Sequence, residues 1–362
     1  MAAAKRPTHQ INVSKLFHLG ESCCKKSLRY NTGLPATRQI GAVPLFALAL
    51  VLTLVLAAFA SAQGYSHADR AFVTTLIVFA CFLSLMLLFA ASGVTERFSA
   101  TAGPGSAWLL TPLLFLVYLV YLLGTGTASL LRIVAMAGFL FAPMLLLAWA
   151  QGAASATWQD FATIAVIWTA VKFGPRNWIW PYPSERLAYI FTVVVAVNLA
   201  IAGFLLLRQV KKVGYNISWC TSWTLYIAGA LTVFASIAIP LGVRMHFIAY
   251  APRFSEWKTF IPLSIGILFF TAWPEELLFR GLLQNLVSRA ANNEAVGLVT
   301  ASVLFGFSHI TNLHFPNWKY VLLATIAGLF YGWTWRKTGS IFASALVHAG
   351  VDILWHFLFR TV

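Results

Sequence analysis

Residues 259–283 read TFIPLSIGILFFTAWPEELLFRGLL. The segment is long and apolar enough to cross a bilayer, for which a helix needs about 20 residues. It nevertheless contains two adjacent acids, Glu275 and Glu276, and an arginine, Arg280. A charged side chain at the centre of a membrane helix costs ~2.5–3.5 kcal/mol on insertion scales, so a charge in such a segment is a candidate for function. The stretch therefore predicts a membrane-spanning helix that carries chemistry.

The composition of the whole chain indicates the same class. Of its 362 residues, 60% are hydrophobic and only 10% are charged, whereas soluble domains carry about 25% charged residues. This balance excludes an ordinary soluble enzyme and a disordered chain. The net charge of +15 is typical of basic loops beside anionic lipid headgroups. We predict an all-α polytopic membrane protein whose partner is the lipid bilayer and not nucleic acid.

About eleven apolar segments are candidates for membrane-spanning helices. They lie near residues 41–62, 71–92, 106–124, 127–150, 160–175, 187–207, 221–243, 259–283, 295–311, 318–335 and 339–359. Residues 1–40 are basic, and the positive-inside rule predicts that this N-terminal segment is cytoplasmic. An organelle transit peptide is the alternative interpretation.

The segment 174–186, GPRNWIWPYPSER, is rich in Trp, Tyr and Pro. We interpret it as part of an interfacial aromatic belt, with a substrate-binding loop as the alternative. Lys172, Arg176 and Arg186 lie in or beside it, on the side that the predicted topology places away from the cytoplasm. The helices of 41–215 are expected to be accessory and of unknown role, and 216–362 to form the chemical core.

The segment Pro274-Glu275-Glu276-Leu277-Leu278-Phe279-Arg280 is the first candidate site motif. Pro274 removes a backbone N–H and kinks or restarts the helix. Glu276 and Arg280 are four residues apart and can pair on one helical face. Glu275 then points about 100° away, free to face a cavity. A purely structural ion pair would explain Glu276 and Arg280 but would leave Glu275 without a role.

Two further motifs follow in later apolar segments. In Phe305-Gly306-Phe307-Ser308-His309, Phe305 and His309 share a helical face, and Gly306 allows close helix approach. His348 and Asp352 are likewise four residues apart in the last segment. Taken singly, His309 would be an interfacial histidine. The pair of His348 and Asp352 would be a metal half-site, a proton relay or a structural hydrogen bond.

Together the three motifs suffice for amide hydrolysis inside a membrane. A glutamate and a histidine can activate water as general bases. A second histidine with a neighbouring aspartate can stabilise the oxygen on which negative charge develops. We therefore interpret Glu275, His309, His348 and Asp352 as catalytic candidates, with Glu276 and Arg280 in support.

The order Glu-Glu-x-x-x-Arg, Phe-x-x-x-His and His-x-x-x-Asp resembles the CPBP family of intramembrane proteases. Its members include the type II CAAX prenyl endopeptidases and bacteriocin-processing or self-immunity proteins. Residues 328–352, GLFYGWTWRKTGSIFASALVHAGVD, are also similar to that family. The resemblance covers roughly residues 258–356 and implies a helical core that encloses an intramembrane cavity.

The resemblance also implies a role for each residue. Glu275 would activate the water with His309 as its partner base, while His348 and Asp352 would bind the oxyanion. Asp352 stands where the prenyl endopeptidases typically have Asn, and an ionised Asp can only accept hydrogen bonds. It would therefore have to be protonated, or orient His348 by accepting its N–H.

The expected activity is cleavage of a membrane-associated peptide or protein, in a bacterial inner membrane. Two histidines and two acids could bind Zn²⁺, but no HExxH motif is present and the prenyl endopeptidase branch resembles a metal-free glutamate protease. We expect no metal and no other cofactor. The alternatives are a transporter or proton-coupled channel that uses the same groups, and a non-catalytic immunity or scaffold protein.

Overall fold

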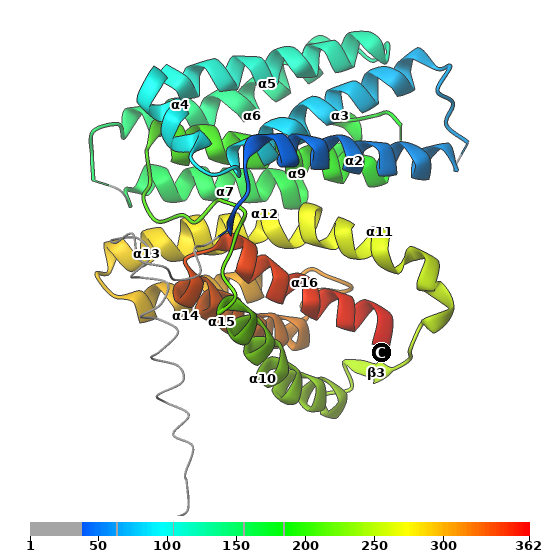
Figure 1. Ribbon diagram of the computed structural model, residues 1–362, viewed down its shortest axis with the longest axis vertical. Coiled ribbons are helices and arrows are strands. Elements are labelled where there is room, and N and C mark those ends of the chain that lie inside the picture. The colour runs from blue at the N-terminus through cyan, green and yellow to red at the C-terminus, as the bar shows by residue number, and fades with distance from the viewer. Residues whose placement is uncertain (1–37, 63, 104, 155, 184) are drawn as a thin grey trace, which may run out of the picture.

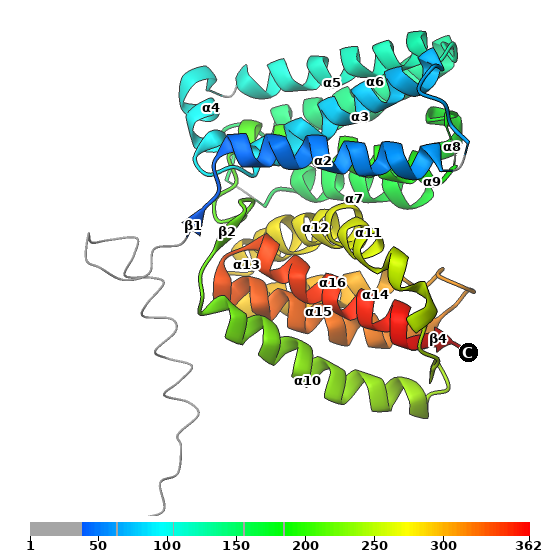
Figure 2. The same ribbon diagram turned by 45° about the vertical axis from the view of Figure 1, so that its right-hand side comes forward.

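The computed structural model describes residues 38–362 except positions 63, 104, 155 and 184. The predictions for residues 1–37 therefore lie outside the described residues. Figures 1 and 2 show two helical bundles side by side, with α2–α9 in one and α10–α16 in the other. The assignment of 41–215 as accessory and of 216–362 as the protease core stays a prediction.

In the part of the chain that the structure describes, the first bundle contains eight helices and a π-helical extension. They are α2 (Ala42–Ser61), α3 (Arg70–Phe89), α4 (Val94–Ala102), α5 (Gly105–Gly124), α6 (Leu130–Trp149), α7 (Trp158–Phe173), α8 (Arg176–Ile179), α9 (Glu185–Ala200) and η1 (Ile201–Leu207).

The second bundle begins after a short connection and contains the charged motifs. Its elements are α10 (Trp223–Arg244), η2 (Phe254–Glu256), α11 (Trp257–Ile267), η3 (Leu268–Ala272), α12 (Trp273–Glu276), η4 (Leu277–Gln284), α13 (Asn285–Ala290), α14 (Glu294–Phe307), α15 (Trp318–Thr338) and α16 (Ile341–Leu358).

Two short antiparallel pairs fasten the ends of the bundles. Strand β1 (Arg38–Gln39) pairs with β2 (Ser218–Trp219), and β3 (Ile248–Tyr250) pairs with β4 (Phe359–Thr361). Figure 2 shows the two pairs at opposite ends of the helices. The first pair connects the start of α2 to the segment before α10, and the second holds the C-terminal residues beside the end of α10.

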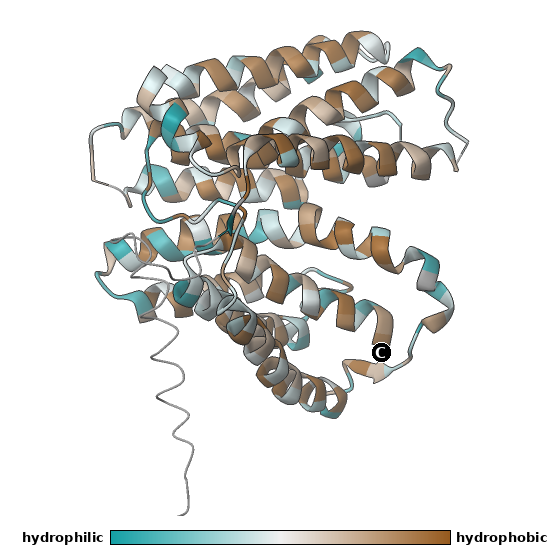
Figure 3. Cartoon of the chain, viewed as in Figure 1, coloured by the Kyte–Doolittle hydropathy of each residue, from teal (hydrophilic) through white to brown (hydrophobic). Residues whose placement is uncertain are grey.

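The predicted class, an all-α polytopic membrane protein, is confirmed. Within the described residues, eight helices are long and apolar enough to cross a membrane. All eleven predicted segments are helical within the described residues, but α7, α14 and α15 are not among the eight. The count of about eleven therefore stays a prediction. Figure 3 shows hydrophobic residues along the helices and hydrophilic ones mainly near their ends.

The quoted segment forms part of a long interrupted helix over Lys258–Ala290. The π-helical turns η3 and η4 lie on either side of Pro274 and α12. A proline cannot donate a backbone hydrogen bond, and π-helical turns are frequent at functional sites. The predicted irregularity of the helix at Pro274 is thus present, and it lies beside Glu275 and Glu276.

The aromatic segment is partly a core element and not only a belt. Trp180 is 1% exposed, and its ring packs against Tyr118, Tyr121 and Phe191. The belt interpretation is therefore wrong for Trp180. The segment packs against α5, because the hydroxyls of Tyr118 and Tyr121 donate to the backbone oxygens of Ile179 and Tyr182.

The charges of the loops do not decide which end of the bundles faces the cytoplasm. At the end of the bundles where β1 and β2 pair, Arg289 donates to the backbone oxygen of Lys211, and Arg336 pairs with Glu294. The opposite end, near β3 and β4, is also basic, with Arg244, Lys319 and Arg360. The cytoplasmic position of the N-terminus stays a prediction.

Gly306 sets the contact between α14 and α15. A Cβ atom there would lie 2.6 Å from the backbone oxygen of Val321 and would also meet the side chain of Thr325. Replacing Gly306 with Leu is expected to lower the free energy of unfolding by ~1–3 kcal/mol, because overpacking forces the helices apart. Gly266→Leu is the matched control, since nothing lies within 4 Å of its added Cβ. Equal destabilisation of both variants in an SDS unfolding titration would contradict this packing.

Candidate functional site

The two adjacent glutamates diverge as their spacing predicts. The side chain of Glu276 is fully buried, whereas that of Glu275 is 30% exposed and lines a cavity. Both lie at the end of α12, where the helix passes into the π-helical turn η4. One carboxylate is therefore built into the protein interior, and the other is accessible to a ligand.

Glu276 is the centre of a buried polar network. Its Oε1 lies 2.9 Å from Nη1 of Arg280 and 2.9 Å from Nδ1 of His348. Its Oε2 accepts a hydrogen bond from the Ser344 hydroxyl at 2.5 Å. Arg280 also donates to the backbone oxygen of Gly328 and lies over the ring of Phe305. The predicted pair of Glu276 and Arg280 is confirmed, and it also connects α12 to α16.

His348 lies between this network and the cavity. Nε2 is 3.6 Å from Oδ2 of Asp352 and 3.9 Å from Oε2 of Glu275. The ring stacks on Tyr331, with centroids 4.5 Å apart and an interplanar angle of 15°. Since Glu276 accepts at Nδ1, the buried side of the ring is fixed and Nε2 is directed at the two exposed carboxylates.

The geometry shows which carboxylate makes the close contact with His348. Glu276, and not Asp352, makes the close contact that orients His348. Asp352 lies on the cavity side of the ring, beyond hydrogen-bonding distance but near enough for an ionic contact. Glu276, which was predicted only to support the site, therefore orients His348.

The hydrogen bonds of His309 assign its tautomer. Nδ1 lies 2.8 Å from the backbone oxygen of Phe305 and 3.0 Å from the hydroxyl of Ser308. A carbonyl oxygen can only accept, so Nδ1 carries the proton and Nε2 of the neutral ring carries the lone pair. This is the form that a general base requires. The ring also packs on Phe305 and Tyr320.

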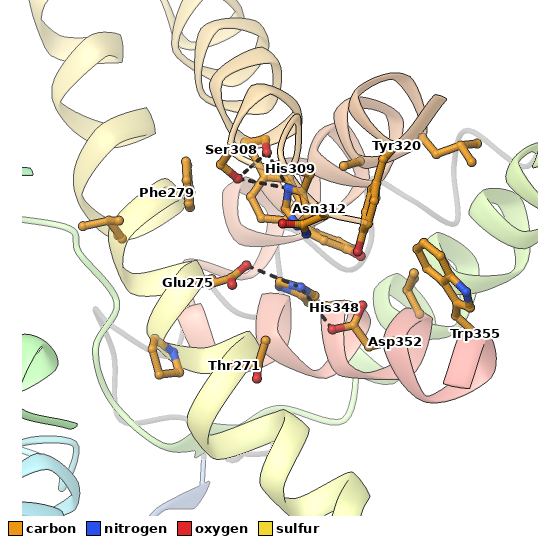
Figure 4. Close-up of a pocket in the computed structure, with 18 of the residues that line it drawn as sticks. Thr271, Glu275, Phe279, Ser308, His309, Asn312, Tyr320, His348, Asp352 and Trp355 are labelled. Carbon is orange, nitrogen blue, oxygen red and sulfur yellow. Dashed lines mark hydrogen bonds and ion pairs between the residues drawn. The ribbon is translucent and has the colours of Figure 1, made fainter. Parts of the chain in front are cut away.

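A cavity of about 430 Å³ brings the candidates together. Glu275, His309, His348 and Asp352 all line it, and Figure 4 shows them around one space. Glu275 comes from α12, His309 from the turn that follows α14, and His348 and Asp352 from α16. Glu276 and Arg280 are not among the lining residues and lie behind His348. Most of the remaining wall is apolar, as suits a site for a hydrophobic segment.

Several residues at the site had no sequence prediction. Tyr331 and Ser344 support His348, and Asn312 and Tyr320 line the cavity beside His309. Ser344 had a signal, since it lies one helical turn before His348 on the same face. Lys172 had none, because it comes from the first bundle and reaches Asn312 across 140 residues.

Within residues 38–362, apart from the four positions not described, no three His, Cys, Asp or Glu side chains are arranged to hold a metal ion. One nitrogen of His348 is already bound to Glu276. The expectation that no metal is used stays a prediction.

Comparison with protein families supports the resemblance. Residues 257–354 match the model of the family described as Type II CAAX prenyl endopeptidase Rce1-like. The match covers just over a quarter of the chain and contains all six candidate residues. No curated protein and no solved structure matches the chain.

Proposed function

We propose that this multi-pass membrane protein, which carries an Rce1-like domain over residues 257–354, is an intramembrane endopeptidase. Its substrate is a membrane-associated peptide or protein, and its site lies in a bacterial inner membrane. The observation that carries the proposal is the cavity in which Glu275 faces His348 while His309 presents an unprotonated Nε2.

Glu275 and His309 activate the attacking water. The water oxygen bonds to the carbonyl carbon of the substrate while one of its protons passes to the Glu275 carboxylate or to Nε2 of His309. Collapse of the tetrahedral intermediate breaks the C–N bond, and the same proton goes to the leaving amine. The products are a carboxylic acid and an amine, and no oxidant or cofactor is consumed.

His348 stabilises the oxyanion. In its doubly protonated form, Nδ1–H is held by Glu276 and Nε2–H is available to the oxygen on which charge develops. Asp352 contacts the same Nε2 before the substrate arrives. This arrangement needs no protonated Asp352, because Glu276 orients His348 and the imidazolium, not the aspartate, donates to the oxyanion.

The alternative function, transport or proton conduction, makes a different prediction from hydrolysis. A proton path would need polar groups that continue beyond the cavity, and the stretch of η4 and α13 beyond the glutamates buries Leu282 and Leu286 beside Gln284 and Asn285. These residues lie between the glutamates and the end of the helix that carries Arg289. Absence of pH-driven flux in proteoliposomes, together with peptide cleavage, is the result that separates the two functions.

Replacing His309 with Ala tests its role as partner base. We expect the rate of peptide cleavage in proteoliposomes to fall by about 10²–10⁴-fold, which is the usual contribution of a general base. His314→Ala is the matched control, because His314 is exposed in the same loop and does not line the cavity. Equal rates for His309→Ala and the wild-type protein, measured by mass spectrometry of the products, would exclude this role.

A further inference from the structure

The first bundle contributes two cations to the cavity. Lys172 at the end of α7 and Arg176 at the start of α8 both line it. Neither lies within residues 257–354, so the family match does not cover them. Both side chains are only half-buried.

Both cations are held by neutral groups. Nζ of Lys172 donates to Oδ1 of Asn312 at 2.5 Å. Arg176 donates weakly to the backbone oxygen of Val171 at 3.4 Å, and its guanidinium lies 5.3 Å from the ring centroid of Tyr189. Among the side chains that the structure describes, no carboxylate lies within 4.0 Å of either cation.

Two other arginines of the described residues, whose side chains are buried, pair with carboxylates, whereas Arg132 is held by the backbone oxygens of Thr127 and Trp178. Arg208 makes two contacts with the carboxylate of Asp160, at 2.8 and 3.0 Å, and Arg280 pairs with Glu276. Burying a charge in an apolar interior costs free energy unless a charge of opposite sign lies beside it. Lys172 and Arg176 therefore differ from Arg208 and Arg280 in having room for an anion that comes from outside the protein.

We propose that Lys172 and Arg176 form a subsite for a carboxylate of the substrate. The inference rests on the proposed function, because it assumes that a peptide occupies the cavity. Charge-assisted hydrogen bonds to guanidinium and ammonium groups are the usual means of holding a carboxylate. Glu275 and Asp352 repel an anion, so a substrate carboxylate is directed away from them and toward α7 and α8. The accessory bundle thus selects the substrate while the C-terminal bundle cleaves it.

Asn312 connects this subsite to the catalytic groups. Its side chain holds Lys172, and its backbone N–H donates to the backbone oxygen of His309 at 3.0 Å. Figure 4 shows Asn312 beside His309 at the same space. A carboxylate held by Lys172 therefore lies close to the loop that carries the partner base.

Peptide binding by the full-length protein in nanodiscs tests the subsite. The probes are palmitoylated, fluorescent six-residue peptides of alanine and leucine, with empty nanodiscs as the lipid blank. One pair ends in a free carboxylate or in an amide. A second pair, both amidated, has an internal glutamate or glutamine. The protein carries Glu275→Gln or, separately, His309→Ala, so that the probes are not consumed.

We expect one charged probe to bind at least 10-fold more tightly than its neutral partner. The pair that shows the preference identifies the source, either the terminal carboxylate or an acidic side chain. Lys172→Met and Arg176→Leu should each remove most of the preference and leave the affinity for the neutral probe within twofold. Lys172→Arg should retain it. Asn312→Asp, which supplies a carboxylate to Lys172, should abolish it, and Lys319→Met, an exposed cation outside the cavity, should not change it.

Three results would overturn the subsite. One is equal binding of charged and neutral probes. Another is equal weakening of both probes by Lys172→Met, which would indicate a structural role. The third is a preference in Glu275→Gln protein that is absent in His309→Ala protein, which would make Lys172 the counter-ion of Glu275. If instead the preference is present but wild-type protein cleaves no bound probe, the proposed function fails and the subsite stands.

Discussion

Replacing Glu275 with Gln is expected to reduce peptide hydrolysis by about 10²–10⁴-fold, because a general base contributes that factor. The substitution keeps the size and shape of the side chain but removes the group that accepts the water proton. Glu275 is not in the buried network, since its side chain is 30% exposed and its ionic contact with Nε2 of His348 is 3.9 Å long. The variant should therefore fold as the wild-type protein does.

Glu256→Gln is the control for this experiment. Glu256 precedes the same long helix but is exposed and does not line the cavity. Its variant should cleave the substrate at the wild-type rate. A Glu275→Gln protein that retains cleavage would transfer the role of base to another group and would refute the proposed mechanism.

Replacing Glu276 with Ala is expected to have the largest effect on stability. It leaves the guanidinium of Arg280 without a counter-charge, and it removes the acceptor of Ser344 and His348. Breaking one side of a buried pair costs ~3–5 kcal/mol, because the remaining charge is uncompensated. An SDS unfolding titration in mixed micelles, followed by Trp fluorescence, would measure the loss.

The exposed pair of Arg336 and Glu294 provides the matched control. Their side chains are 31% and 74% exposed, and exposed ion pairs contribute only ~0–1 kcal/mol. Glu294→Ala should therefore change the free energy of unfolding by less than the Glu276 variant. The double variant Glu276→Leu with Arg280→Met should lose less stability than Glu276→Ala alone, since no charge is left unpaired. Equal losses in the single and double variants would contradict the network.

Helical spacing predicted the local part of the site. Residues four apart share a face, and this was enough to pair Glu276 with Arg280 and to direct Glu275 elsewhere. The same rule placed Phe305 beside His309, whose rings are 4.8 Å apart. Such contacts depend on one helix only, and therefore do not require knowledge of how helices pack.

The long-range part of the site could not be predicted in this way. Glu276 and His348 lie on different helices, and no spacing rule states which acid of the pair would meet the imidazole. Lys172 was interpreted as a loop charge, because its contact with Asn312 depends on how the two bundles pack together. Trp180 was assigned to the interface on composition alone, whereas three aromatic neighbours bury it.

The most direct test is a mass-spectrometric comparison of membrane-fraction peptides from cells that express the wild-type chain, Glu275→Gln or Glu256→Gln. The mechanism predicts new peptide termini in the wild-type and Glu256→Gln samples that are absent from the Glu275→Gln sample. Termini that are identical in all three samples would contradict the claim that Glu275 activates water for peptide hydrolysis.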